Sequence, residues 1–481
     1  MPTLIVVDNK DEWPFEIPGV DVVEARSYLN GAGWNRLRGA KLFNLCRSYR
    51  YQSLGYYVTL SATARGHLPL PNLTSIQDMK SQTVVRFVSD DLDELIQHSL
   101  APIQSDRFTL SIYFGRNLAR RYDRLSRHLF NLFQAPLLRA QFTRNGKWQL
   151  RQIGPIPVGE IPDRHRSFVL HVSTEHFAGR HQRLRKRTPT KYDMAMLVDP
   201  NEESSPSDAL ALKRFIRAGE SLGIGVETIT RDDYGRVAEF DALFIRETTA
   251  VNHHTYRFAR RAAMEGLVVI DDPESILKCS NKVYLAELLE RHEVPVPRTI
   301  IVHRDNVESI GRDLGFPCVL KQPDAAFSQG VVKVANQEEL LEKAEEFLGK
   351  SELVVAQEFL PTGFDWRVGM LDRQPLFVCK YHMAHKHWQI IKREGDGEKR
   401  YGKSETVPLD EVPRRVLQAA TRAANLIGDG LYGVDVKEVN GRPYVIEVND
   451  NPNIDSGVED RLLKNDLYRR VMQVFLDRLE R

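Results

Sequence analysis

Three oxygen-bearing side chains come together in the stretch GVDVKEVNGRPYVIEVNDNPN, residues 433–453. An Asn-Gly pair between two apolar runs predicts a tight hairpin. Asp435 lies on the first strand, while Glu447 and Asn449, two residues apart on the second, face the same side. Carboxylates held among apolar neighbours repel each other unless a cation lies between them. The set therefore suits Mg²⁺ bound together with substrate phosphates; an ordinary hairpin with acids on its solvent face is the alternative.

Two lysines and a short strand upstream suit an anionic nucleotide. Lys321 ends the apolar run CVLK, and a lysine at the end of a buried strand needs an anionic partner. The turn SQGVV, which contains Gly330, follows it, so phosphate is a candidate. Lys282, near the start of a predicted helix, is by itself typical of a surface lysine. The strand VVAQEFL (354–360) could offer the backbone donor and acceptor that an adenine edge requires.

The stretch GEKRYGKSE (397–405) matches the phosphate-binding pattern G-x-x-x-x-G-K-[ST]. A working P-loop follows a buried strand and opens a helix whose amides hold phosphate. Beyond Ser404 the chain reads ETVPLDEVP, and Pro408 and Pro413 forbid a continuous helix. We interpret the match as coincidental, in a solvated basic loop or in a loop that closes over nucleotide with its Lys and Arg.

Histidines offer a competing metal hypothesis. The spacing H-x-x-H-x-H of His382, His385 and His387 could bind zinc, but the alternation points the rings to opposed faces and no cysteine assists. The pair His253-His254 is interpreted as a polar helix start rather than a ligand set. The sequence therefore favours oxygen ligands over imidazoles for its metal.

Composition narrows the class of protein. A chain of 481 residues is expected to form about two to four domains, and 42% apolar residues suffice for their cores. A net charge of +2 argues against a nucleic-acid coat protein, although the basic stretch 181–191 is either a solvated linker or a phosphate-binding segment. Scattered cysteines, no signal peptide and no apolar run of about 18 residues favour a cytoplasmic protein without a membrane span.

The elements that position these residues alternate between strand and helix, which predicts an α/β protein. We expect domains at 1–190, 191–272 and 273–481, with the charged stretch before Lys191 as a linker. In the first domain, TLIVVD predicts a strand, AKLFNLCRSYRYQSLG (40–55) a helix and YYVTLSA (56–62) another strand. In the middle domain, strands and helices alternate at short intervals, which predicts a small parallel sheet.

The order of these motifs resembles the ATP-grasp ligases, and within them the RimK-type carboxylate–amine ligases. The resemblance covers roughly residues 191–481, and its most specific part is the E-V-N-D-N-P hairpin. The first 190 residues resemble an extra N-terminal domain found in a subset of RimK-like proteins. The motifs that carry the resemblance are Lys282, VLK at 319–321, QEFL at 357–360, DWR at 365–367, Asp435, EVN at 447–449 and Pro452, with LFIRE (243–247) upstream.

The resemblance implies an ATP-grasp fold of two α+β lobes, preceded by a parallel α/β domain and an N-terminal α/β domain. It also implies the residues that bind Mg·ATP. The ATP phosphates would be contacted by Lys282, Lys321 and Gly330. Adenine would lie at the hinge along Gln357, Glu358, Phe359 and Leu360, and Asp365 would hold the ribose. Two Mg²⁺ ions, or Mn²⁺ in their place, would be bound by Asp435, Glu447 and Asn449, and Arg367 and Lys380 would face the γ-phosphate and the acyl phosphate.

The implied reaction is amide formation from a carboxylate and an amine through an acyl phosphate. An amino acid such as glutamate would be added to a peptide, a protein tail or a small acid, in a homo-oligomer without a nucleic-acid or membrane partner. The loop 384–404 departs from the RimK pattern, which bears on the substrate rather than on ATP use. The alternative is a ribosome- or RNA-associated binding protein with a nucleotide-regulated ATP-grasp module.

Overall fold

The computed structural model describes every residue except 1, 14, 32, 35, 36, 38, 185–189, 325–329, 385–390 and 394–398. The chain forms two compact units. The first comprises Met1–Lys191 and Asp232–Glu239, and the second comprises Tyr192–Arg231 and Phe240–Arg481. Within the described residues, none of the helices has the length and apolar character needed to cross a membrane.

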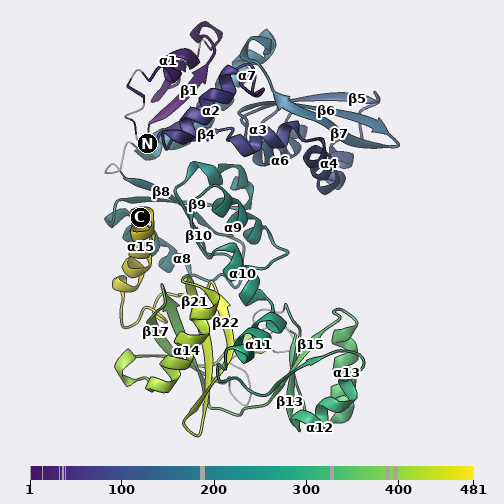
Figure 1. The fold of residues 1–481 in the computed structure, drawn as a ribbon, viewed down its shortest axis with the longest axis vertical. Helices are drawn as coiled ribbons and strands as arrows, with labels where there is room; N and C mark the ends of the chain where they lie inside the picture. Colours follow the sequence, from purple (N-terminus) through teal and green to yellow (C-terminus); the bar gives the residue numbers. More distant parts are fainter. Residues whose placement is uncertain are drawn as a thin grey trace. The chain divides into compact units, whose positions relative to one another are not determined.

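The first unit joins a parallel sheet to an antiparallel one (Figure 1). The parallel sheet has the order β2 (Val20–Glu24), β1 (Thr3–Val7), β3 (Lys41–Asn44), β4 (Leu68–Leu70). The antiparallel sheet has the order β5 (Arg107–Tyr113), β6 (Leu137–Asn145), β7 (Lys147–Pro155). Its principal helices are α1 (Ala25–Leu29), α2 (Leu54–Ala64), α3 (Leu73–Lys80), α4 (Gln82–Asp91), α5 (Asp93–Leu100), α6 (Asp123–Phe133) and α7 (Asp163–Leu184).

Two predictions in this unit are wrong. Residues 41–44, expected in a helix, form strand β3, and residues 56–62, expected as a strand, lie in helix α2. All four residues of β3 are buried because the strand lies between β1 and β4. A short apolar run that is buried on both faces shows no alternation, so its periodicity does not separate strand from helix.

The second unit begins with another parallel sheet. Its order is β9 (Ile224–Ile229), β8 (Tyr192–Leu197), β10 (Ala242–Ile245), β11 (Val268–Ile270), which is the strand order of the first unit repeated. The helices α8 (Ala209–Ser221), α9 (His254–Met264) and α10 (Pro273–Ser280) accompany it. The 3-10 segment η5 (Arg231–Glu239) runs between β9 and β10, and most of it belongs to the first compact unit.

The repetition extends beyond the sheets. The run α2, β4, α3, α4 corresponds to the run α9, β11, α10, α11 (Lys282–Arg291), and the bounds of the four pairs differ by the same number of residues. The burial pattern also matches through most of the two segments. The repeat is not apparent in the sequence, because buried apolar residues can replace one another while the fold is kept.

Two antiparallel sheets complete the second unit. The smaller has the order β12 (Thr299–Val302), β15 (Val354–Glu358), β13 (Cys318–Lys321), β14 (Val331–Val334), with α12 (Ile310–Leu314) and α13 (Gln337–Leu348). The larger has the order β20 (Ser404–Val407), β17 (Gln374–His382), β16 (Phe364–Leu371), β21 (Leu431–Val439), β22 (Arg442–Asp450), with α14 (Arg414–Ile427) packed on it. A separate ribbon pairs β18 (Ile391–Arg393) with β19 (Lys399–Tyr401).

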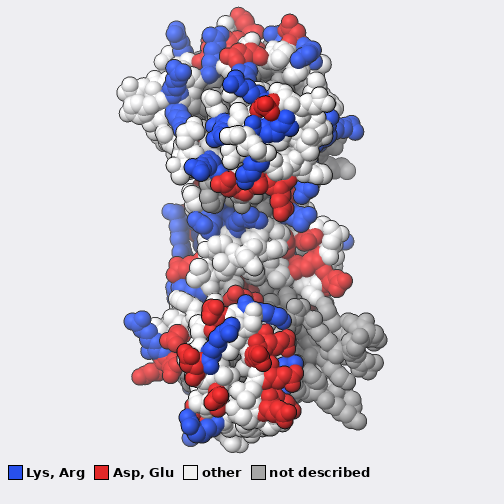
Figure 2. All heavy atoms as spheres, turned by 90° about the vertical axis from the view of Figure 1, so that its right-hand side faces the viewer, with Lys and Arg blue, Asp and Glu red and all other residues white. Residues whose placement is uncertain are grey.

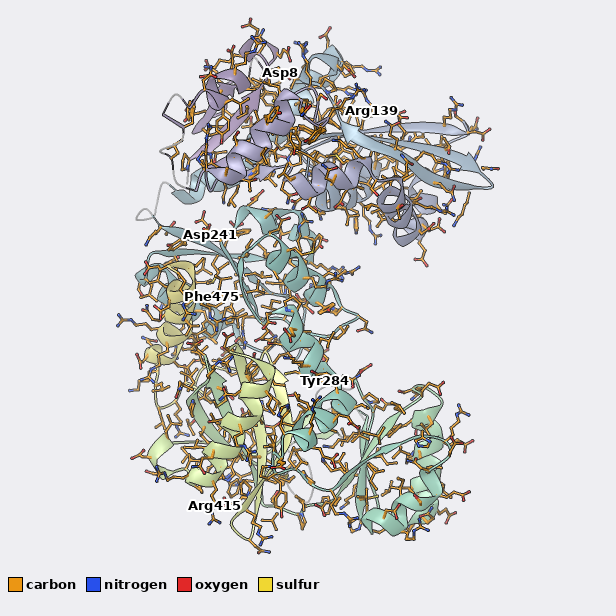
Figure 3. The ribbon with its side chains drawn as sticks, viewed as in Figure 1. Asp8, Arg139, Asp241, Tyr284, Arg415 and Phe475 are labelled. Atoms are coloured by element: carbon orange, nitrogen blue, oxygen red, sulfur yellow. The ribbon has the colours of Figure 1, made fainter. Side chains whose placement is uncertain are left out.

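Helices connect these sheets into one unit. Figure 1 shows α11 between the two antiparallel sheets, and it contacts both β15 and β22. The C-terminal helix α15 (Asn465–Leu479) packs against α8, and its Phe475, labelled in Figure 3, meets the ring of Phe244 on β10 at 5.3 Å between centroids. One apolar core therefore contains side chains of the parallel sheet, of the larger antiparallel sheet and of α15.

Charges of both signs are interspersed among uncharged residues on the described atoms of the face in Figure 2. This distribution agrees with the small net charge of +2. A nucleic-acid-binding surface is expected to concentrate lysine and arginine along one stripe. The visible face offers no support for that class of partner.

Candidate active site

Strand pairing brings three charged side chains into one row. Arg367 on β16 lies directly opposite Asp435 on β21, and Asp435 lies directly opposite Glu447 on β22. Residues opposite each other on antiparallel strands share one face of the sheet. The predicted hairpin that carries the two acids is confirmed, with Asn440 and Gly441 both at positive φ in its turn.

Arg367 and Asp435 form a two-point ion pair. Nη2 of Arg367 lies 2.9 Å from Oδ2 of Asp435, and Nε contacts Oδ1. The two side chains are 15% and 14% exposed. Burial raises the pKa of Asp435, although the charge of Arg367 acts in the opposite direction. Burial acts to lower the pKa of Arg367, but the interaction with Asp435 is stronger and raises it. Nδ2 of Asn449 donates to Oδ2 of Asp435 at 3.2 Å, so Asn449 joins the group.

Lys282 completes the row at its other end. Its Nζ lies 2.9 Å from Oε1 of Glu447, and the residue is buried at the first position of α11. The interpretation of Lys282 as a surface lysine is therefore wrong. The helix starts here because Asn281 caps it by accepting from the amides of Val283 and Tyr284. Burial opposes ionisation of Glu447, but Lys282 and neighbouring cations hold its pKa below the usual value.

Lys321 lies on the smaller antiparallel sheet and is also buried. Its Nζ donates to Oε1 of Gln357 at 2.8 Å, and Nε2 of Gln357 donates to Thr299 at 3.0 Å. Burial lowers the pKa of Lys321 to about 8, and the positive charges of Lys282 and Lys437 act in the same direction. An ammonium that loses stability in this way favours an anionic partner such as phosphate.

The predicted hinge follows the end of β15. Glu358 closes the strand, and its Oε1 accepts from the amide of Arg298 at 2.8 Å. Phe359 and Leu360 come directly after it and are partly buried. Gly330 has φ 62 and its carbonyl accepts from the amide of residue 322 at 2.8 Å. The rest of the turn, residues 325–329, lies outside the described residues.

Asp365 has a partner that the sequence analysis did not anticipate. Nζ of Lys437 lies 2.5 Å from Oδ1 of Asp365 and 2.7 Å from the hydroxyl of Thr362. Lys437 follows Asp435 by two residues on β21, so the period of a strand could have assigned it to the same face. Any ligand held by Asp365 would share this carboxylate with Lys437.

Lys380 is not brought to the row. It lies opposite Trp366 on β16, one position away from Arg367, and therefore on the other face of the sheet. Its Nζ lies 5.0 Å from the ring centroid of Trp366 and 5.2 Å from that of Phe364. The structure thus separates the two cations that were predicted to share the catalytic role.

Tyr381 and Glu459 are further neighbours that the sequence analysis missed. The guanidinium of Arg367 lies 5.4 Å from the ring centroid of Tyr381, whose hydroxyl donates to Glu459. Glu459 is buried, and burial raises its pKa. The signal for Tyr381 was its alternation with Lys380 along β17, but Glu459 lies on a turn beyond β22 and shows no local pattern.

A buried arginine ties the chain after β22 to the parallel sheet. Arg246, 0% exposed, follows β10 and donates to the Asn451 side chain at 2.6 Å. It also donates to the carbonyls of Pro206 and Pro452 and to the hydroxyl of Ser207. Burial lowers its pKa to about 10. These hydrogen bonds hold the segment that follows β22, the strand that carries Glu447.

The P-loop match has the geometry of a strand. Lys403 precedes β20, and Ser404 is its first residue, paired with Tyr381. A Cβ at Gly402 would lie 1.7 Å from the carbonyl oxygen of His382, so the glycine serves a close backbone approach. No helix begins at Lys403 to hold phosphate, and Gly397 lies outside the described residues. Of the zinc pattern, only His382 is described, because His385 and His387 are outside those residues.

Comparison with known protein families identifies both halves of the chain. Residues 25–172 match the RimK-like ATP-grasp N-terminal domain, and residues 279–453 match the ATP-grasp domain. The chain is a RimK-like ATP-grasp ligase. The protein has the mixed α/β ATP-grasp fold.

Relatives of the ligase each match about half of it. An alpha-aminoadipate–LysW ligase LysX from Saccharolobus solfataricus is 26% identical over 261 residues, which are 50% of this chain and 88% of that protein. A probable alpha-L-glutamate ligase from Vibrio vulnificus is 26% identical over 47% of this chain and 73% of its own. A RimK domain ATP-grasp protein from Sphaerobacter thermophilus is 18% identical with a TM-score of 0.45, covering 58% of this chain and 98% of that one.

ATP-grasp ligases use ATP and Mg²⁺, and the residues present suit the metal. Asp435 and Glu447 are partly buried carboxylates on paired strands, and Asn449 adds an amide oxygen beside them. Hard oxygen ligands of this kind are those that Mg²⁺ prefers. Protein cations, Lys282 and Arg367, contact one carboxylate each, so these carboxylates already attract positive charge.

Proposed function

We propose that this ligase activates a substrate carboxylate with ATP and then joins it to an amine. The observation that carries the proposal is the partly buried row of charges in which the carboxylates of Glu447 and Asp435 lie between the cations Lys282 and Arg367. Such a row could hold a Mg²⁺-bound triphosphate in one orientation, with the cations facing the phosphates and the carboxylates facing the metal. Positioning and charge neutralisation are the main demands of phosphoryl transfer.

The reaction would run in two steps. A carboxylate oxygen of the substrate attacks the γ-phosphorus of ATP, ADP leaves, and an acyl phosphate forms. The amine nitrogen then attacks the acyl carbon, phosphate leaves and the nitrogen gives up a proton. The protein would supply no covalent nucleophile in either step, and Arg367 is suited to clamp phosphate or carboxylate oxygens by its two-point geometry.

The remaining assignments follow the position of each side chain. Lys282 and Lys321, buried with their ammonium groups in polar surroundings, would contact the phosphates. Mg²⁺, when bound, draws negative charge from the phosphate oxygens. Two ions, with Mn²⁺ as a substitute, would be bound by Asp435, Glu447 and Asn449, and the nucleoside would be bound by Gln357, Glu358, Phe359, Leu360, Asp365 and the turn at Gly330. Lys380 takes no part in this assignment because it lies on the other face.

The substrates are proposed from the relatives. The names of the relatives specify glutamate ligation and ligation of alpha-aminoadipate to LysW. We infer that this enzyme adds an amino acid such as glutamate to a peptide, a protein tail or a small acid. The domains would be 1–190, 191–272 and 273–481, with the ATP site in the last.

The test is direct measurement of turnover. The full chain is incubated with Mg·ATP and pooled amino acids, with and without candidate acceptors, and released phosphate and product mass are recorded. An amide product formed with stoichiometric phosphate is expected, and Glu411→Gln, on an exposed 3-10 turn, serves as a surface control. ATP binding without ADP release under any of these conditions would instead support the binding-protein alternative.

A further inference from the structure

Three potential metal ligands gather where β10 leaves the parallel sheet. Glu247, His253 and His254 each offer one ligand atom, and these atoms lie within 4.8 Å of one another. The side chain of Glu247 is 3% exposed and that of His254 is 16% exposed. None of the three belongs to the nucleotide site described above. The cluster lies at the carboxyl end of a parallel strand, the edge at which open α/β sheets bind their ligands.

His254 and Glu247 form a close ion-pair contact without hydrogen-bond geometry. Nε2 of His254 lies 2.6 Å from Oε1 of Glu247, yet this nitrogen has no hydrogen-bond partner among the described residues. Oε2 of Glu247 also has none within the described part of the chain. A buried carboxylate oxygen without a donor costs free energy. A cation between these atoms would satisfy both of them.

A capping role does not account for the histidines. His253 stands at the start of α9, as predicted, but its side chain makes no capping hydrogen bond. At the corresponding start of α2 in the first unit, the side chain of Ser53 does accept from the amide of Tyr56. The repeated fold thus places an ordinary cap in one copy and an imidazole that does not cap in the other.

The donor set selects a class of metal. Two imidazoles and a carboxylate suit borderline ions of the zinc class, whereas Mg²⁺ prefers oxygen ligands alone. Imidazoles that bind a metal through one nitrogen usually hydrogen-bond through the other. The hydroxyl of Thr255 lies 3.1 Å from Nδ1 of His253, in the position of such an outer partner.

We propose that Glu247, His253 and His254 bind one divalent transition-metal ion of the zinc class. Three protein ligands leave a fourth position open to water or to a donor atom of a substrate. Nδ2 of Asn451 donates to the carbonyl of Glu247 at 2.7 Å, so this loop is tied to the segment that follows Asn449. The ion would lie near the end of β22 but on ligands of its own, and its binding does not depend on ligase activity.

The first experiment uses the metal-free full chain without ATP or Mg²⁺. Isothermal titration with Zn²⁺ is expected to give about one tight site per chain, and His254→Ala and Glu247→Gln should each weaken it at least about tenfold, since each removes a ligand. His292→Ala, an exposed histidine after α11, is the matched control and should bind as the parent does. Full-strength binding by both ligand variants would overturn the proposal.

Two further measurements cover the remaining outcomes. Simultaneous substitution of His382, His385 and His387 by alanine should leave zinc binding intact, and loss of the site in that variant would assign it to the other histidine pattern and refute ours. X-ray absorption of the zinc-loaded parent needs no variant to fold. It should show nitrogen and oxygen ligands with the signature of two imidazoles, and sulfur ligation or no zinc uptake would contradict the site.

Discussion

Lys282 and Arg367 each hold one of the two carboxylates proposed to bind Mg²⁺. Nζ of Lys282 lies 2.9 Å from Glu447, and Nη2 of Arg367 lies 2.9 Å from Asp435. A buried charge pair is costly to break from one side only. Mg·ATP can enter without leaving either cation unpaired, because the phosphates bring their own negative charge. The cations would then turn from the carboxylates to phosphate oxygens.

Glu447→Gln should lower the rate of ADP release by about 100-fold or more while the protein stays folded, because it removes a charge that the metal and Lys282 share. The rate is measured by coupled ADP detection across a Mg²⁺ titration, with circular dichroism to check the fold. Glu411→Gln, on an exposed 3-10 turn, should retain normal activity. Near-normal turnover of folded Glu447→Gln would remove the metal assignment.

Lys321 should make nucleotide binding depend on pH. Burial lowers its pKa to about 8, so the free protein loses this charge as the pH rises through 8, whereas bound phosphate would restore the charge. Mg·ATP affinity should therefore fall between pH 7 and 9, and binding at pH 8.5 should take up protons. Calorimetry in buffers of different ionisation enthalpy measures this uptake.

Lys321→Met is the matched variant for that measurement. It keeps much of the side-chain volume without an ionisable group, so its proton uptake on binding near pH 8.5 should be smaller than that of the parent. The lowered pKa of Lys321 also makes the free energy of unfolding depend on pH. The unfolded lysine, with a pKa near 10.4, binds more protons than the folded one between about pH 8 and 10.4, so this residue makes stability rise with pH in that window. Equal uptake by the two proteins would assign the proton to another group.

Elements could be predicted where a few neighbouring residues specify them. The β21–β22 hairpin was predicted because an Asn-Gly turn and alternating apolar residues specify it within a few positions. Strand β3 was missed because it is buried on both faces and lacks alternation. Residues 56–62 were predicted as a strand because they include β-branched and aromatic residues. They lie in helix α2, where tertiary packing overrides this propensity.

The candidate site divides in the same way. Asp435, Glu447 and Asn449 were predicted as a group because one hairpin holds them. The partners that come from distant segments were not predicted. The contacts of Lys437 with Asp365 and of Tyr381 with Arg367 depend on strand register, and Glu459 lies on a turn. Register is set by how strands pair across the whole sheet, which a single segment does not encode.

Arg246→Met should destabilise the second unit by about 3 kcal/mol, because it leaves buried carbonyl groups of Pro206 and Pro452 without their donor. Chemical denaturation with circular dichroism measures the loss. Arg246→Lys, which keeps the charge but not the planar set of donors, should lose less. An exposed arginine on α14, Arg415, labelled in Figure 3, provides the control substitution to methionine, which should be nearly neutral. Equal stability of the Arg246 and Arg415 variants would show that the hydrogen bonds of Arg246 do not contribute to the free energy of unfolding.

The molecule uses one α/β design twice. The sheets β2-β1-β3-β4 and β9-β8-β10-β11 have the same strand order, and the helices that follow them correspond. In the second copy α11 begins with Lys282, whereas in the first copy α4 begins with Gln82. The first copy thus keeps the scaffold but lacks the phosphate-binding candidate at that position. We propose from this difference that residues 1–190 present the acceptor and do not bind ATP.

The fragment 191–481 is expected to bind Mg·ATP with an affinity close to that of the full chain, because every residue proposed to contact nucleotide lies within it. It should turn over the true acceptor poorly, since residues 1–190 are proposed to present that substrate. Calorimetry with Mg·ATP and the ligation assay measure the two properties separately. A folded fragment that fails to bind nucleotide would show that the first domain completes the ATP site.

The segment Asp232–Glu239 decides how this fragment must be made. It lies between β9 and β10 of the second unit but belongs to the first, where the carbonyl of Gly235 accepts from Gln134 at 2.6 Å and its Cα faces Asn131 so closely that a Cβ would lie 2.4 Å from that side chain. Cutting at residue 191 leaves this segment without those partners. Replacing the buried Val237 and Ala238 by serine in the fragment should therefore improve its solubility without changing Mg·ATP affinity. A loss of nucleotide binding on this replacement would mean that the segment supports the second unit as well, and that the two compact units are not energetically separate.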